Sequence, residues 1–183
     1  MRIAVFVSGR GSNLKALLDE NKHSEIFVFS NKKREPQAFA WARRRGVSTE
    51  LVSLQDESDW EALAEKLNFL KIKKVLLLGF MKIAPEVFLS RLQADCINLH
   101  PSLLPAFPGL KSIEKTFESK KSMGCTVHQV SALVDSGKIY LQKEIRPPFL
   151  KFSKFVEQVH FAEQESVAKH CDRSLINMGT GSL

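Results

Sequence analysis

The segment 74–79 constrains the fold of this chain more than any other part of the sequence. It carries four consecutive apolar residues, Val75-Leu76-Leu77-Leu78. Continuous apolar residues, without polar alternation, are typical of a strand that is covered on both faces. Such strands belong to parallel sheets with helices on either side, so the segment predicts an α/β fold.

Strand-like and helix-like patterns alternate on both sides of this segment. Further strands are expected over 3–8, 26–30, 51–52 and 96–97. Helices are expected over 13–21, 36–46, 58–70 and 85–92. This order predicts a mostly parallel sheet with helices on both faces. Ligands bind at the carboxyl ends of the strands in such sheets, so polar residues that follow a strand are candidate site residues.

The pattern changes near Gly124. Residues 125–130 and 138–142 alternate as strands do, and the turn-forming residues 132–137 join them. A helix is expected over 152–169, followed by a frayed tail over 177–183. The sequence therefore predicts one domain over 1–183, in which an antiparallel strand pair and a helix complete the fold.

A glycine-rich loop over 8–13 joins the first expected strand to the first expected helix. Helix N-termini offer free N–H groups and the positive end of the helix dipole, so Gly11, Ser12 and Asn13 are predicted to bind a phosphate. A tight turn in which Ser12 or Asn13 caps the helix is the alternative. The loop is a poor dinucleotide motif, because Leu14 stands where a third glycine is expected.

Asn98 and His100 are the candidate catalytic residues at the end of the strand that begins near 96. In an extended segment they point to the same face, and Pro101 ends the regular hydrogen bonding. An amide and an imidazole in this place can stabilise a carbonyl oxygen that gains negative charge. An isolated Asn-x-His is more often a turn beside a surface or core histidine. The residues around the pair therefore decide whether it is interpreted as catalytic.

That context resembles the folate-dependent formyltransferases. Residues 98–105 read N-L-H-P-S-L-L-P and match the family signature N-x-H-x-S-L-L-P. Three further motifs resemble the same family, in the same order along the chain. They are G-R-G-S-N-L at 9–14, G-F-M-K-I at 79–83, and G-C-T-V-H at 124–128 followed by D-S-G at 135–137. The resemblance runs from Met1 to about Glu165. It implies a Rossmann-like formyltransferase fold, with a phosphate-binding half at 1–100 and a half at 101–183 that supplies the folate loop and the C-terminal helix.

The resemblance implies that Asn98, His100 and Asp135 are catalytic. A carboxylate near an imidazole favours the imidazolium, so Asp135 would keep His100 charged. His128 is expected either beside this set or as a buried packing histidine. Ser102 is not expected to act as a nucleophile, because it lacks an evident base partner.

The resemblance also implies a glutamate for the substrate amine and an apolar folate pocket. Glu163 matches the glutamate, although Gln164 replaces the expected histidine, and Glu165 is the alternative register. Taken without the family, Met81 and Ile83 are more often core residues. The residues expected to bind folate are Leu77, Met81, Lys82, Ile83, Ala84, Leu89, Asn98, Leu133 and Val134.

The implied reaction moves a formyl group from 10-formyltetrahydrofolate directly to a primary amine, with no metal. The glycine loop and the compact length are most similar to family members that formylate phosphoribosylglycinamide in de novo purine biosynthesis. The segment 110–123 departs from the family. A formyltransferase for another amine, such as an amino sugar nucleotide, and a non-catalytic folate-binding relative are therefore the alternatives.

Composition narrows the remaining classes of function and partner. The net charge is +7, but the basic runs are scattered and lack interleaved aromatic residues, so no nucleic-acid partner is expected. No apolar run approaches the roughly 20 residues of a membrane helix, and the N-terminus is too short for a signal peptide. Cys96, Cys125 and Cys171 form neither a disulfide framework nor a zinc motif. A cytoplasmic monomer or homodimer without a membrane partner is expected.

Overall fold

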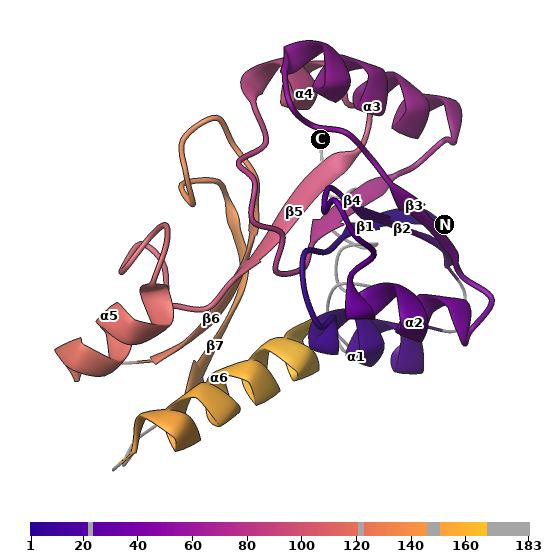
Figure 1. Ribbon diagram of the computed structural model, residues 1–183. Coiled ribbons are helices and arrows are strands. Elements are labelled where there is room, and N and C mark those ends of the chain that lie inside the picture. The colour runs from indigo at the N-terminus through magenta and orange to yellow at the C-terminus, as the bar shows by residue number, and fades with distance from the viewer. Residues whose placement is uncertain (22–23, 121–122, 146–150, 168–183) are drawn as a thin grey trace, which may run out of the picture.

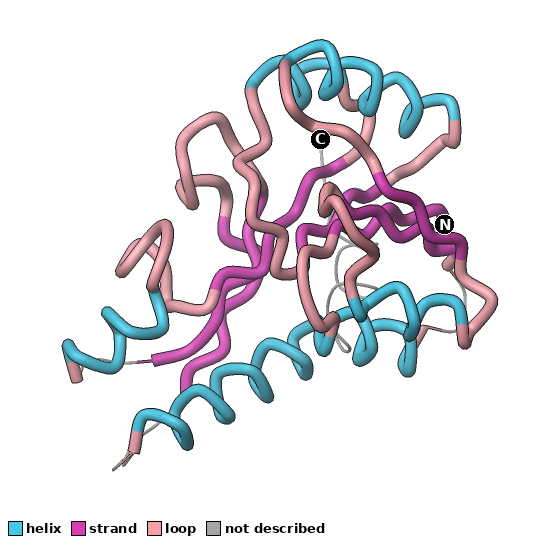
Figure 2. Tube along the Cα trace, in the orientation of Figure 1, coloured by secondary structure: helices cyan, strands magenta, loops and turns pink. Residues whose placement is uncertain are grey.

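The computed structural model describes residues 1–21, 24–120, 123–145 and 151–167. They form one seven-stranded sheet between two layers of helices (Figures 1 and 2). The strands are β1 (Arg2–Phe6), β2 (Glu25–Ser30), β3 (Ser48–Leu51), β4 (Lys74–Leu77), β5 (Asp95–His100), β6 (Met123–Gln129) and β7 (Ile139–Ile145). The helices are α1 (Ser12–Glu20), α2 (Gln37–Arg43), α3 (Glu57–Phe69), α4 (Glu86–Arg91), α5 (Ser112–Ser119) and α6 (Phe152–Ser166).

The strand order is β3-β2-β1-β4-β5-β6-β7. Strands β1 to β5 pair in parallel, whereas β6 pairs antiparallel with β5 and with β7. The predicted α/β fold with an antiparallel C-terminal strand pair is confirmed. The chain moves outward from β1 to β3 and then returns to β4, so the carboxyl ends of β1 and β4 flank a topological switch point. Ligands of open α/β sheets bind at such a point.

Two hydrophobic clusters fill the spaces between the sheet and its helices. Helices α1, α2 and α6 cover one face, and α3 and α4 cover the other (Figure 1). All four residues of β4 are buried, which confirms that this strand is covered on both sides. Within the described residues, no helix is both long enough and apolar enough to cross a membrane.

Strand β3 and helix α5 differ most from the sequence prediction. Strand β3 ends at Leu51, where the predicted strand began, because its register with β2 pairs Phe27 with Ser48 and Ser30 with Leu51. Helix α5 forms within the segment 110–119, for which no helix was predicted. Its Ile113 and Phe117 are four residues apart and pack against a small core cluster around Phe155, Met123 and Val159. Residues 168–169, Cys171 and the tail at 177–183 lie outside the described residues.

Candidate active site

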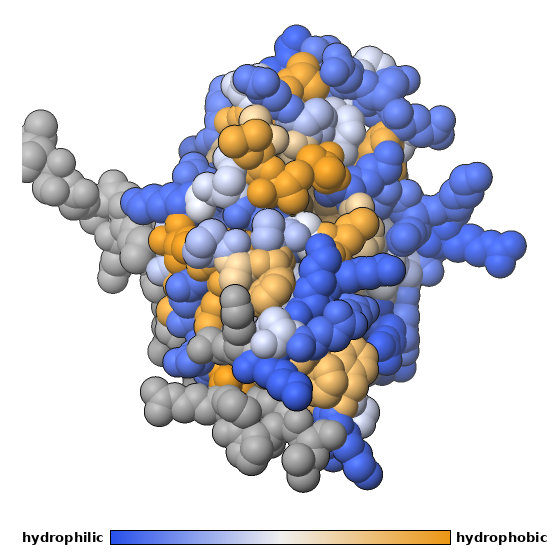
Figure 3. Space-filling model, turned by 90° about the vertical axis from the view of Figure 1, so that its left-hand side faces the viewer, coloured by the Kyte–Doolittle hydropathy of each residue, from blue (hydrophilic) through white to orange (hydrophobic). Residues whose placement is uncertain are grey.

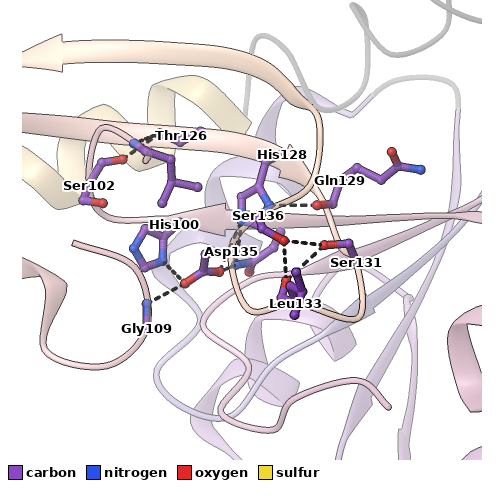
Figure 4. Close-up of polar contacts among 12 residues, drawn as sticks. His100, Ser102, Gly109, Thr126, His128, Gln129, Ser131, Leu133, Asp135 and Ser136 are labelled. Carbon is purple, nitrogen blue, oxygen red and sulfur yellow. Dashed lines mark hydrogen bonds and ion pairs between the residues drawn. The ribbon is translucent and has the colours of Figure 1, made fainter. Parts of the chain in front are cut away.

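Five segments come together at the carboxyl ends of the parallel strands. The glycine loop after β1 and the loop after β4 touch, because the Met81 N–H donates to Ser8 Oγ at 3.2 Å. Strand β5 brings Asn98 and His100 to the same edge. The antiparallel register of β6 places His128 opposite Asn98. The loop between β6 and β7 adds Asp135, which completes a cluster of polar side chains (Figure 4).

Asp135 is the centre of this cluster. Its Oδ2 lies 3.2 Å from His100 Nδ1 and accepts a hydrogen bond from the Gly109 N–H at 2.7 Å (Figure 4). Its Oδ1 lies 3.4 Å from His128 Nε2. Asp135 adopts a left-handed backbone conformation, with φ of 51°. The hydroxyls of Ser131 and Ser136 both donate to the Leu133 carbonyl and hold the loop in this shape.

The environment of His100 suits the imidazolium form. One ring nitrogen faces Asp135, and Nε2 lies 3.0 Å from the Phe107 carbonyl oxygen. Both oxygens are acceptors, so both ring nitrogens of His100 face groups that favour a proton on the ring. His100 is buried. The cluster therefore holds a proton donor in a site that water reaches poorly.

Asp135 carries the balancing negative charge. Burial alone raises the pKa of this carboxyl group. The hydrogen bond from His128, the Gly109 N–H and the charge of His100 outweigh burial, and together they lower the pKa from 3.8 to about 2. Asp135 is therefore ionised throughout the neutral range.

His128 and Asn98 hold each other in place beside Asp135. His128 Nδ1 lies 2.8 Å from the Gln129 carbonyl oxygen, so this nitrogen carries a proton. Nε2 lies 3.2 Å from Asn98 Nδ2 and 3.4 Å from Asp135 Oδ1. Asn98 Nδ2 also donates to Asp135 Oδ1 at 3.4 Å. An oxyanion contact by Asn98 requires one of these N–H groups to turn toward substrate.

The loop 101–109, which carries the Phe107 carbonyl, is fixed by buried hydrogen bonds. Thr126 Oγ1 donates to the Ser102 carbonyl at 2.7 Å and accepts from the Leu104 N–H at 3.0 Å. The Ser102 hydroxyl donates to the Ala106 carbonyl at 2.6 Å. Ser102 therefore supports the loop through its hydroxyl, and its expected lack of a nucleophilic role stays a prediction.

The glycine loop presents its backbone at the N-terminus of α1. Gly11 is the N-cap residue, with φ of 78°, and no side chain caps the helix. The alternative role of Ser12 or Asn13 as a cap is therefore wrong. Ser12 is exposed, and Asn13 Oδ1 is buried without a hydrogen-bond partner among the described residues. The phosphate-binding role of this loop stays a prediction.

Glu163 lies on α6 and is buried. Its Oε2 is 3.0 Å from His160 Nδ1, one helical turn earlier. Glu165, the alternative match, pairs instead with Lys143 of β7. His160 was not singled out from the sequence. Its spacing of three residues before a glutamate on one helix was the available signal.

Comparisons with known proteins place the chain in a family. The family model described as formyl transferase matches residues 1–168. The chain belongs to this formyl transferase family. The resemblance found in the sequence is thus confirmed at the family level.

Individual relatives agree with the family match. Phosphoribosylglycinamide formyltransferase of Escherichia coli (strain K12) is 34% identical over 155 residues, covering 79% of this chain and 73% of that protein. The trifunctional purine biosynthetic protein adenosine-3 of Drosophila pseudoobscura pseudoobscura is 31% identical over the whole chain, which spans only 14% of its length. The crystal structure of phosphoribosylglycinamide formyltransferase from Streptococcus pneumoniae TIGR4 has a TM-score of 0.86 at 32% identity, covering 96% of this chain and 99% of that one.

The residues that the family resemblance assigned to folate fall into two groups. Met81, Ile83 and Leu133 are 65%, 68% and 74% exposed, and Val134 is also exposed. The alternative view of Met81 and Ile83 as core residues is therefore wrong. Figure 3 shows apolar groups in the upper half and centre of the face seen from the left of Figure 1. Leu77, Ala84 and Leu89 instead belong to the cluster under α3 and α4.

Two further features limit the chemistry of this formyl transferase family member. Lys82 Nζ donates to the Leu54 carbonyl at 2.5 Å, so this amine ties two loops together. Cys96 and Cys125 are free and buried, and burial raises their thiol pKa values to about 12 and about 11. Neither thiol is an activated nucleophile.

No group of three potential metal ligands lies together in the part of the chain that the structure describes.

Proposed function

We propose that this protein transfers a formyl group from 10-formyltetrahydrofolate to the amine of phosphoribosylglycinamide, a step of de novo purine biosynthesis. The observation that carries the proposal is the contact of His100 with Asp135 at the sheet edge that also carries the glycine loop. A buried imidazolium suits a carbonyl oxygen that becomes negative as an amine attacks it. Membership in the formyl transferase family supports the same reaction class.

In this proposal two loops from different halves of the chain bind different substrates. The half up to residue 100 supplies Gly11, Ser12 and Asn13 for the phosphate of the acceptor. The half from 101 onward supplies the loop of Leu133 and Val134, whose exposed apolar side chains would contact the folate beside Met81 and Ile83. Asp135 lies in the same loop, so folate binding would bring the formyl group to the catalytic cluster.

The chemical step follows from the hydrogen bonds of the cluster. The acceptor nitrogen attacks the formyl carbon, a C–N bond forms, and the carbonyl oxygen takes the negative charge. His100 and Asn98 stabilise that oxygen. The oxygen has to compete with the Phe107 carbonyl for the Nε2 proton of His100. When the tetrahedral intermediate collapses, the bond to the folate nitrogen breaks, and the proton lost by the amine passes to that nitrogen with the help of Asp135.

The test is an assay of formyl transfer with the full chain and two acceptors, phosphoribosylglycinamide and an amino sugar nucleotide. Absorbance of the released folate follows turnover. Turnover with phosphoribosylglycinamide alone supports the proposal. Turnover with the amino sugar nucleotide alone assigns a different acceptor to the same chemistry. Folate binding without turnover on either acceptor would point to a binding protein and overturn the proposed reaction.

A further inference from the structure

The segment that joins β2 to α2 lies against the glycine loop. Strands β1 and β2 pair in parallel, so the segments that follow them leave the same edge of the sheet. The Ala38 N–H donates to the Gly9 carbonyl at 3.3 Å, which ties the start of α2 to the glycine loop. Figure 1 shows the two connections next to each other above α1 and α2. Residues 31–36, called the basic loop below, therefore border the loop that is expected to bind phosphate.

Four cationic side chains stand on these two loops. Arg10 belongs to the glycine loop, and Lys32, Lys33 and Arg34 follow one another in the basic loop. All four residues are exposed, and within the described part of the chain none of these side chains forms an ion pair. Like charges at neighbouring positions raise the local positive potential, and such a potential attracts multiply charged anions.

The cations on the adjoining helices are paired, in contrast to these four. Glu35, the one acid of the basic loop, accepts two N–H groups of Arg43, at 2.8 and 2.6 Å. Asp19 of α1 pairs with both Lys15 and Arg45. The acids next to the glycine loop are thus engaged elsewhere, and they leave the charges of the basic loop uncompensated.

Two buried amide groups accompany the cations. Asn13 lies in the first turn of α1, and Asn31 begins the basic loop. The Oδ1 atoms of both are buried and have no hydrogen-bond partner among the described residues. Buried polar atoms in folded proteins are nearly always hydrogen-bonded. An asparagine amide can present either its oxygen or its N–H groups. Both amides are therefore available to a polar ligand at the glycine loop.

We propose that Arg10 and the basic loop form an anion subsite beside the glycine loop, and that the two together bind a ligand with two adjacent phosphoryl groups. The glycine loop would hold one phosphoryl group through backbone N–H groups, and the cationic side chains would hold the other. This inference goes beyond the proposed function, because phosphoribosylglycinamide carries a single phosphate. A compound with a diphosphate group would compete with that acceptor for the glycine loop.

The first test compares the binding of inorganic pyrophosphate and inorganic phosphate to the full chain by calorimetry. The wild type should bind pyrophosphate about tenfold more tightly than phosphate, because a second phosphoryl group gains charge-assisted hydrogen bonds. The double variant Lys32→Gln, Lys33→Gln should lose most of that preference. The double variant Lys71→Gln, Lys73→Gln is the matched control, because it removes two exposed cations that precede β4, at the opposite edge of the sheet. It should keep the preference.

Two results would overturn the subsite. One is equal wild-type affinity for pyrophosphate and phosphate. The other is an equal loss of preference in the two double variants, since net charge alone would then explain the binding.

A second measurement separates this inference from the proposed reaction. If the wild type formylates phosphoribosylglycinamide, pyrophosphate should inhibit in competition with that acceptor, and it should inhibit the Lys32→Gln, Lys33→Gln variant less. Inhibition that is not competitive would contradict shared use of the glycine loop. If the wild type shows no formyl transfer but its preference for pyrophosphate depends on Lys32 and Lys33, the proposed reaction fails and the anion subsite stands.

Discussion

His100 Nδ1 lies 3.2 Å from Asp135 Oδ2, within a cluster where the opposite ring nitrogen of His100 lies 3.0 Å from the Phe107 carbonyl oxygen. His100 comes from the end of a strand, Asp135 from a loop between antiparallel strands, and the Phe107 carbonyl from a proline-rich loop. This geometry ties the charge of the imidazole to two protein oxygens. It makes His100 a donor whose Nε2 proton can move from a backbone carbonyl to a substrate oxygen.

Replacing His100 by Ala should remove most of the activity. The oxyanion would lose one donor in a buried site, which typically costs about 3 to 4 kcal/mol of barrier, or roughly a factor of 100 to 1000 in kcat. The measurement is formyl transfer at saturating folate, with thermal melting to verify folding. Ser102→Ala is the control, because this hydroxyl supports a loop and faces no base. Loss of all turnover in Ser102→Ala with normal folding would instead indicate a covalent mechanism.

Asp135 should make stability depend on acid pH. Its pKa is about 2 in the folded protein, below the ordinary 3.8, so its contribution is fully present above about pH 4 and is lost as the pH falls toward 2. Asp135→Asn should therefore lower the free energy of unfolding by on the order of 1 kcal/mol near neutral pH and progressively less toward pH 2. Denaturant unfolding of both proteins across this range measures the difference. A difference that stays constant with pH would contradict the assigned charge.

Thr126 should matter for stability through its hydroxyl. Thr126→Val keeps the shape but leaves the Leu104 N–H and the Ser102 carbonyl without their buried partner. The expected loss is about 1 to 3 kcal/mol of unfolding free energy. Thr126→Ser retains the hydroxyl and should recover most of that loss. Equal destabilisation of the two variants in urea unfolding would mean that the methyl group, and not the hydrogen bonds, is responsible.

The two glycines of the loop after β1, Gly9 and Gly11, should respond differently to alanine. A Cβ on Gly11 would lie 2.5 Å from the Ala38 Cβ, and the residue has φ of +78°. Gly11→Ala should therefore cost about 2 kcal/mol of stability and weaken anion binding. A Cβ on Gly9 would meet no atom within 4 Å, so Gly9→Ala should change stability by less than about 0.5 kcal/mol. Chemical unfolding of both variants measures the two losses of stability. Similar losses would contradict the steric conflict with Ala38 that is expected only at Gly11.

Local patterns predicted the parts of the fold that depend on neighbouring residues. The apolar run in β4 and the alternation of strands and helices were sufficient for the α/β fold with its antiparallel C-terminal pair. Strand β3 was displaced and α5 was missed. The bounds of β3 follow its pairing with β2, and α5 is stabilised by the packing of Ile113 and Phe117 on a distant cluster. Such long-range contacts leave only weak local signals.

The sequence by itself determined the family, the order of the elements apart from α5, and the choice of Asn98, His100 and Asp135 as candidate residues, because motif spacing and hydrophobic period are properties of the linear chain. Only the tertiary structure decided how these groups meet. It joined His100 to Asp135, tied Asn98 to His128, exposed Met81 and Ile83, and paired Glu163 with His160. Each of these outcomes depends on strand register and helix packing between segments far apart in the chain, and distance between such segments is what a linear sequence does not contain.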